Sequence, residues 1–141
     1  MGEERHAGGL VKAVDTNLVV RLLIQDDPDQ AARAGAVFDE GVFVPLTVFL
    51  ETGWLLKSRY RFSRSQVART LRALLDMPEV TVPDADKVRW AVDRLTVAGD
   101  LADLVHLVAS SAEADAFVTF NRALARSAGE TTPLPIETLK S

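Results

Sequence analysis

The chain of 141 residues contains no cysteine, and its only histidines are His6 and His106. Without cysteine, neither a disulfide framework nor a thiolate metal site can form. No apolar run approaches the ~20 residues of a membrane span, and the N-terminal stretch MGEERHAGGL lacks the apolar centre of a signal peptide. We therefore expect a cytoplasmic protein in which residues 1–9 form a flexible leader.

The remaining composition is that of an ordinary globular domain, with 48% hydrophobic and 26% charged residues. There is no internal repeat, low-complexity segment or long linker, so we expect residues 10–141 to form one domain. The net charge of −4 argues against a protein that coats nucleic acid by bulk electrostatics. It does not exclude a nuclease, because acids gathered around a metal ion attract phosphate once the ion is bound.

Strand-like and helix-like patterns alternate along the chain. A capping box at Ser63–Gln66, caps at Thr47 and Asp100, and stops at Gly41 and Gly99 delimit the helices. Alternation of this kind predicts parallel crossover units, and hence a three-layer α/β/α sandwich with a central, mostly parallel sheet of about five strands. Strands are predicted over 11–14, 41–45, 79–83, 116–120 and 134–139, and helices over 18–24, 29–39, 47–55, 63–75, 84–98, 101–114 and 122–128.

One acid stands at the end of the first predicted strand, in KAVDTNLVVRLLIQDDP. Ligands of parallel α/β sheets bind outside the carboxyl ends of the strands, so Asp15 is expected to project into that crevice. The alternative is that Asp15 or Asn17 merely caps the following helix, as Asp and Asn commonly do.

Other acids are expected at the same edge. Glu51 lies in the apolar helix LTVFLETGWLL, on its apolar side, where a cation or an arginine partner would compensate its burial. Asp100 and Asp103 lie in the first turn of DLADLVHLVA, and VTFNR places Thr119 and Asn121 at the end of the fourth strand. The alternatives are a structural ion pair for Glu51 and helix-dipole stabilisation for the two aspartates.

These oxygen donors suit Mg²⁺ or Mn²⁺, for which two or three carboxylates from separate elements suffice. Histidine cannot supply the site, since His106 is more typical of a packed helix residue. The sequence contains no Gly-rich phosphate loop, no Ser-His-Asp set and no Gly-x-Ser-x-Gly turn.

The stretches AVDTNLVVRLLIQDDPDQAARA, PLTVFLETGWLL and DLADLVHLVASSAEADAFVTFNRAL together resemble the PIN-domain ribonucleases, most of all the VapC-type toxins of toxin–antitoxin pairs. The resemblance implies a PIN-like fold in which acids surround one or two Mg²⁺ or Mn²⁺ ions that activate water to cut RNA. Asp15, Glu51 and Asp103 match three acidic positions. The fourth position is usually Asp in the family and is Asn121 here. An uncharged amide implies weaker binding of a second ion, and Asp100 is a candidate to supply the missing negative charge. Thr16, Asn17 and Thr119 match positions that shape the site.

The resemblance also implies partners, namely an RNA substrate, a cognate antitoxin and a second copy in a homodimer. The basic stretch KSRYRFSR, with Arg59, Arg61 and Arg64, is a candidate for RNA or partner contact, as is Arg122. The alternative for this stretch is a solvated loop between helices whose aromatic residues anchor it to the core.

Two other functions remain open from the sequence. A signalling domain with a phosphorylated Asp would need a lysine near the last strand, where only Lys140 is available. A PIN-like module that is weak or inactive in catalysis, but still binds antitoxin or RNA, is suggested by Asn121.

Overall fold

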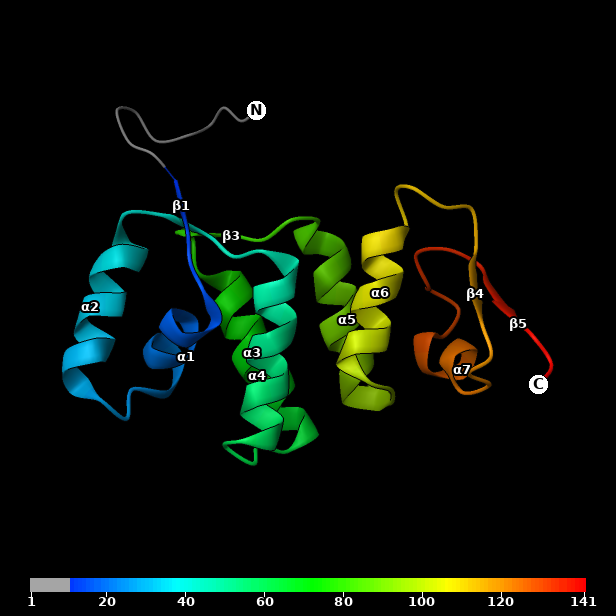
Figure 1. The fold of residues 1–141 in the computed structure, drawn as a ribbon, viewed down its shortest axis with the longest axis horizontal. Coiled ribbons are helices and arrows are strands. Elements are labelled where there is room, and N and C mark those ends of the chain that lie inside the picture. The colour runs from blue at the N-terminus through cyan, green and yellow to red at the C-terminus, as the bar shows by residue number, and fades with distance from the viewer. Residues whose placement is uncertain (1–10) are drawn as a thin grey trace.

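The computed structural model describes residues 11–141, so the predicted leader and His6 lie outside the described residues. Helices and strands alternate along the described part of the chain, as the sequence predicts (Figure 1). The strands are β1 (Lys12–Ala13), β2 (Val42–Phe43), β3 (Val80–Thr81), β4 (Phe117–Thr119) and β5 (Ile136–Thr138), and the helices are α1 (Thr16–Ile24), α2 (Pro28–Asp39), α3 (Leu46–Ser58), α4 (Arg64–Asp76), α5 (Ala85–Val97), α6 (Leu101–Ser110) and α7 (Leu124–Ala128).

Two of the predicted helix caps are confirmed. The Ser63 hydroxyl accepts a hydrogen bond from the Gln66 amide at 3.2 Å, and the Ser63 amide donates to Gln66 Oε1 at 2.8 Å, which completes the capping box of α4. At the start of α6, Asp100 Oδ1 accepts from the Asp103 amide at 3.1 Å. Polar side chains at these positions satisfy amide groups that have no partner within the helix.

The predicted cap at Thr47 is wrong. Helix α3 begins at Leu46, and its N-cap is Pro45, which has φ −60° and ψ 153° and makes no side-chain cap bond. Proline fixes φ near the helical value, and an extended ψ makes Pro45 the last residue outside the helix. Thr47 therefore lies inside the first turn of α3.

Other element boundaries differ by a few residues. The strands are two or three residues long, although hydrogen bonding between β1 and β2 continues beyond β1 through the Val14 amide and the Phe43 carbonyl at 3.2 Å. Helix α6 ends at Ser110 rather than at 114, where the hydroxyls of Ser110 and Ser111 bond to backbone carbonyls of the last turns at 2.8 and 2.9 Å. Such side-chain bonds compete with the backbone hydrogen bonds of the helix and so favour a helix end here.

All five strands pair in parallel, which confirms the predicted α/β fold. They form two sheets rather than one continuous sheet. The first has the order β1-β2-β3, with Lys12 opposite Val42 and Val42 opposite Val80, and the second joins β4 to β5, with Phe117 opposite Ile136. In Figure 1 the two sheets lie toward opposite ends of the long axis, with α5 and α6 drawn between them.

The main hydrophobic core lies among the first sheet and helices α1–α6. Its fully buried side chains include Phe49 of α3, Leu71 of α4 and Leu104 of α6. Gly53 brings α3 close to α6, because a Cβ at this position would clash with the Leu101 side chain. This close approach places the start of α6 beside the middle of α3.

A smaller core fixes β4, α7 and β5 to helices α5 and α6. Leu107 of α6 packs with Leu124, Ala128 and Leu134 in this second cluster. Hydrogen bonds hold the same unit to α5: Trp90 Nε1 donates to Thr131 Oγ1 at 2.8 Å, and Arg94 Nε donates to the Ser127 carbonyl at 2.8 Å. The C-terminal unit is therefore anchored by α5 and α6 rather than by β1.

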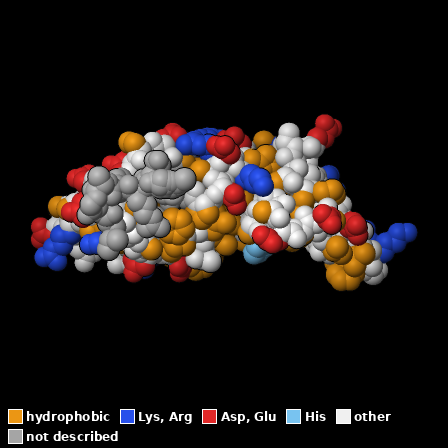
Figure 2. Space-filling model, turned by 90° about the horizontal axis from the view of Figure 1, so that it is seen from above, with side chains coloured by type: hydrophobic (Ala, Val, Ile, Leu, Met, Phe, Trp, Pro, Cys, Tyr) orange, Lys and Arg blue, Asp and Glu red, His pale blue; other side chains and the backbone are white. Residues whose placement is uncertain are grey.

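The outer edge of β1 and the outer edge of β4 are not paired with another strand within residues 11–141. Both residues of β1 are exposed, and on or after β4 the side chains of Val118 and Phe120 are 54% and 62% exposed. Seen from above (Figure 2), the molecule is elongated, and described acidic and basic side chains are interspersed over this face. Among the described helices, none is both long and apolar enough to cross a membrane.

Candidate active site at the helix starts

Asp15 lies immediately after β1 and caps α1. Its Oδ1 accepts a hydrogen bond from the Leu18 amide at 3.0 Å, so the helix-cap interpretation is correct. The cap uses one carboxylate oxygen, and Oδ2 has no hydrogen-bond partner among residues 11–141. Capping and ligand binding are therefore compatible, because the cap fixes the direction of the side chain while leaving one oxygen available.

Thr16 connects this turn to α3. Its hydroxyl donates to Glu51 Oε1 at 2.6 Å across 35 positions of sequence, and the Thr16 residue is buried. Glu51 itself is exposed, so the expectation that it faces a buried apolar side is wrong, and it makes no ion pair with an arginine among residues 11–141. A cation partner for Glu51 stays a prediction. Its structural partner is a neutral hydroxyl, and Trp54, three residues further along α3, is likewise exposed.

Asp103 lies in the first turn of α6, near its cap residue Asp100. Partial burial and the neighbouring Asp100 carboxylate raise the pKa of the Asp103 carboxyl above its usual value, while His106 opposes this shift. The raised pKa means that Asp103 binds a proton more readily than an ordinary aspartate does. A bound cation would remove this penalty by compensating both charges.

Asn121 joins the end of β4 to α6. Its Nδ2 donates to Asp103 Oδ2 at 3.5 Å, while its Oδ1 accepts from the Ala123 amide at 3.0 Å and its own amide donates to Thr119 Oγ1 at 2.9 Å. The side chain thus presents its donor to Asp103 and uses its oxygen in the turn. The Thr119 hydroxyl thus accepts a hydrogen bond within this turn, and its site-shaping role stays a prediction.

The acids form two groups. The first consists of Asp15 and Glu51, linked through Thr16, and the second consists of Asp100 and Asp103, with Asn121 beside them. The packing of Gly53 against Leu101 brings the helices that carry the two groups together. Across residues 11–141, however, no three acidic or histidine side chains are close enough to hold one metal ion.

The chemistry of these donors fits Mg²⁺ or Mn²⁺, because all of them are oxygen ligands and none is a thiolate or imidazole. Asp15 retains one carboxylate oxygen without a hydrogen bond, and Glu51 is exposed. In the described conformation, the two groups would have to approach each other to share a single ion.

The predicted basic contact residues have different surroundings. Arg64 donates to the carbonyls of Leu95 and Gly99 at 2.9 and 2.7 Å, so it holds α4 to the end of α5. Arg59, Arg61 and Arg122 are exposed. Arg64 therefore has a structural role in this conformation, whereas the other three remain predicted contact residues.

A cavity of about 310 Å³ adjoins Asp15 and is not among the features predicted from the sequence. It lies between α1 and α2, and its lining includes Asn17, Arg21, Gln30 and Arg33. A sequence signal was present, because Arg21 interrupts the apolar run 18–24 and Gln30 and Arg33 are spaced to share one face of α2.

A search of curated proteins finds no match. The family model described as PIN domain matches residues 12–130, which include every candidate acid and Asn121. The chain therefore belongs to the PIN domain family.

Proposed function

We propose that this chain is a divalent-metal-dependent endoribonuclease that serves as the toxin of a toxin–antitoxin pair. Members of the PIN domain family are generally nucleases, that is, hydrolases that typically use divalent metals. The observation that carries the proposal is the Thr16–Glu51 hydrogen bond, which joins the turn after β1 to α3 and so groups two carboxylates from separate elements. The choice of RNA as substrate rests on the resemblance of the sequence to PIN-domain ribonucleases.

In this proposal, Asp15, Glu51 and Asp103 hold the metal, with Asn121 and Asp100 as weaker contributors. A bound divalent ion would lower the pKa of a coordinated water and polarise the scissile phosphate. The chain's own contribution is orientation: the cap bond directs Asp15, the Thr16 hydroxyl directs Glu51, and the Asp100 cap fixes the first turn that carries Asp103.

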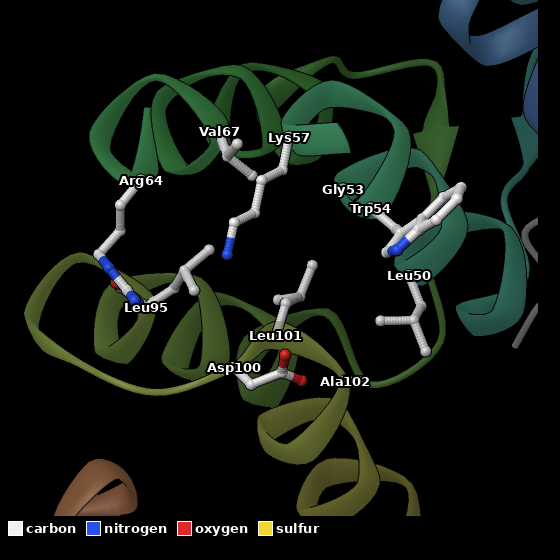
Figure 3. A pocket seen from close by; sticks show the side chains of 10 residues that line it. All are labelled: Leu50, Gly53, Trp54, Lys57, Arg64, Val67, Leu95, Asp100, Leu101 and Ala102. Carbon is white, nitrogen blue, oxygen red and sulfur yellow. The ribbon is translucent and has the colours of Figure 1, made fainter. Parts of the chain in front are cut away.

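The antitoxin is proposed to dock on a small groove between α3, α4 and the start of α6 (Figure 3). The cavity there measures about 90 Å³, well below the ~300–1,000 Å³ of small-ligand sites, so it fits a single anchoring side chain. Leu50 and Leu101 supply apolar walls, Trp54 is 63% exposed, and Lys57 extends its amine toward the same space. These features suit a partner helix that inserts one apolar side chain into the cavity and places an acidic side chain near Lys57.

A homodimer is proposed through the unpaired edge of β4. Val118 and Phe120 expose large apolar side chains on or just after a strand whose outer edge has no partner among residues 11–141. An open strand edge with apolar side chains favours association with another chain. The same strand edge of a second copy would pair with β4 and cover the side chains of Val118 and Phe120.

A second candidate function is a PIN-like module that binds antitoxin or RNA with weak or no cleavage. Two observations favour it: Asn121 stands where a fourth acid is usual, and no three acids among the described residues gather closely enough for one ion. The two functions differ in whether RNA is cut when metal is supplied.

The test is cleavage of a panel of structured and single-stranded RNAs by the purified full chain, with Mg²⁺, with Mn²⁺ or with EDTA. Asp15→Asn is the informative variant, because Asn is also a good N-cap and preserves α1. The matched control is Asp115→Asn, an exposed acid that precedes β4. Metal-dependent cleavage that is lost in Asp15→Asn and kept in Asp115→Asn supports the nuclease. Binding of RNA without cleavage under any of these conditions supports the module.

A further inference from the structure

The cavity between α1 and α2 adjoins the first acidic group directly. Its volume of about 310 Å³ falls at the lower end of the ~300–1,000 Å³ of small-ligand sites. Asp15 is one of its lining residues, so a ligand in this cavity lies next to a carboxylate proposed for catalysis. The cavity is therefore placed to hold a part of the substrate that adjoins the reacting bond.

The cavity combines an apolar wall with polar donors. Leu18 of α1 and Ala34 and Val37 of α2 form the apolar part. Such a surface can cover one face of a nucleobase, while the donors around it can bind polar groups of the same nucleotide.

Two arginines line the cavity together with the Asp15 carboxylate. Arg33 is exposed and makes no side-chain hydrogen bond or ion pair within residues 11–141, so this part of the chain uses none of its five donors. Arg21 is held by Asp26 at 2.8 Å and keeps a buried Nε without a hydrogen-bond partner. A free guanidinium next to a fixed one suits a phosphate group, which accepts paired hydrogen bonds.

Neutral donors complete the lining. Asn17 projects from the first turn of α1 and Gln30 from the first turn of α2, and both are exposed. Neither side chain makes a hydrogen bond within residues 11–141, so both amides are available to base edges or sugar hydroxyls. Single-stranded RNA presents these groups, because its bases are not paired.

We infer that this cavity binds one nucleotide of single-stranded RNA next to the bond that is cut, with its base against Leu18 and Val37 and its phosphate at Arg33. The inference rests on the proposed ribonuclease function, and it adds the residues that position the substrate. Arg33 is a positioning residue in this account, since it contacts the substrate away from the reacting atoms.

The test compares Arg33→Ala with Arg69→Ala, the loss of an exposed arginine on α4 that does not line the cavity. Binding of a fluorescently labelled single-stranded RNA is measured by anisotropy as a function of salt. Both variants are made in a Glu51→Gln background, in which the amide oxygen can still accept from the Thr16 hydroxyl. We expect Arg33→Ala to raise Kd about fivefold or more and to lower the slope of log Kd against log salt by ~0.7, the value for one phosphate contact in a single strand. Arg69→Ala should leave the slope unchanged.

Equal effects of the two variants, or no effect of Arg33→Ala, would overturn the inference. Measurements of steady-state cleavage distinguish failure of the cavity assignment from failure of the proposed nuclease function. If the parent chain cuts RNA and Arg33→Ala has unchanged KM and kcat, the cavity assignment is wrong and the nuclease assignment stands. If RNA binds through Arg33 and nothing is cut, the nuclease assignment is wrong and the nucleotide site stands.

Discussion

The Thr16 hydroxyl donates a 2.6 Å hydrogen bond to Glu51 and so ties the turn after β1 to α3. Thr16 is buried and its neighbour Asp15 is exposed, which directs one residue into the protein and the other toward solvent. A single turn therefore both anchors α3 and presents a carboxylate. This connection makes the Asp15–Glu51 group a defined unit rather than two independent surface acids.

Replacement of Thr16 by valine tests this connection. Thr16→Val keeps the shape of the side chain and removes the donor, so we expect a loss of about 0.5–1.5 kcal/mol in the free energy of unfolding and a fall in metal-dependent RNA cleavage. The control is Thr70→Val, whose hydroxyl bonds to the Gln66 carbonyl of its own helix at 2.9 Å and to no other group among residues 11–141. Cleavage by Thr16→Val at the rate of Thr70→Val would show that the bond does not orient the site.

Gly53 and Gly35 provide a matched pair for the packing of α3 against α6. Both lie within helices, where alanine is favoured over glycine by ~1 kcal/mol. A Cβ at Gly53 clashes with Leu101, whereas one at Gly35 meets only Leu22 Cδ1 at 4.0 Å. Since overpacking costs about 1–3 kcal/mol, Gly53→Ala should be neutral or destabilising and Gly35→Ala stabilising in chemical denaturation. Equal stabilisation by the two substitutions would mean that α3 and α6 do not pack closely at Gly53.

Replacement of Asp103 by asparagine tests the electrostatic penalty in the second group. Because burial and Asp100 raise the pKa of Asp103, the folded state disfavours its charged form. Asp103→Asn should therefore raise Tm at neutral pH. This gain should shrink as pH falls through the raised pKa, and it should vanish below the ordinary value of 3.8, where Asp103 is protonated in both states. A Tm difference that stays constant from neutral to acidic pH would contradict the assigned cause.

Replacement of Asn121 by aspartate tests the departure at the fourth acidic position. Asn121→Asp exchanges the donor at 3.5 Å from Asp103 for a second negative charge, which should lower the stability of the metal-free chain by roughly 0.3–1 kcal/mol. Mn²⁺ should then raise Tm more in the variant than in the parent chain, because the added carboxylate strengthens cation binding. A smaller Mn²⁺ effect in the variant would show that Asn121 does not border the metal site.

The sequence predicts the parts of this structure that depend on local chemistry. The alternation of strands and helices, the Ser63 capping box and the Asp100 cap follow from residue type and spacing. The environment of Glu51 was mispredicted, because helical periodicity showed apolar neighbours but not that α1 supplies a hydroxyl 35 positions away.

The sequence does not predict how segments far apart in the chain pack against one another. The division of the described strands into two sheets depends on how the unit of β4, α7 and β5 is held to α5. Trp90 and Arg94 of α5 bond to Thr131 and Ser127 of this unit, which are far away in the chain. The cavity beside Asp15 likewise depends on the packing of α1 against α2. The division into two sheets leaves no periodic pattern in the sequence, whereas the cavity leaves only a local one, in the position of Arg21 and the spacing of Gln30 and Arg33.

The most direct test of the central claim is the cleavage rate of Asp15→Asn, Asp103→Asn and the double variant on one RNA that the parent chain cuts in Mn²⁺. If the two acidic groups act as one site, each single substitution should lower the rate at least about a hundredfold, and the double variant should be no slower than the slower single one. Cleavage by Asp103→Asn at the parental rate, or losses that simply multiply in the double variant, would contradict the account.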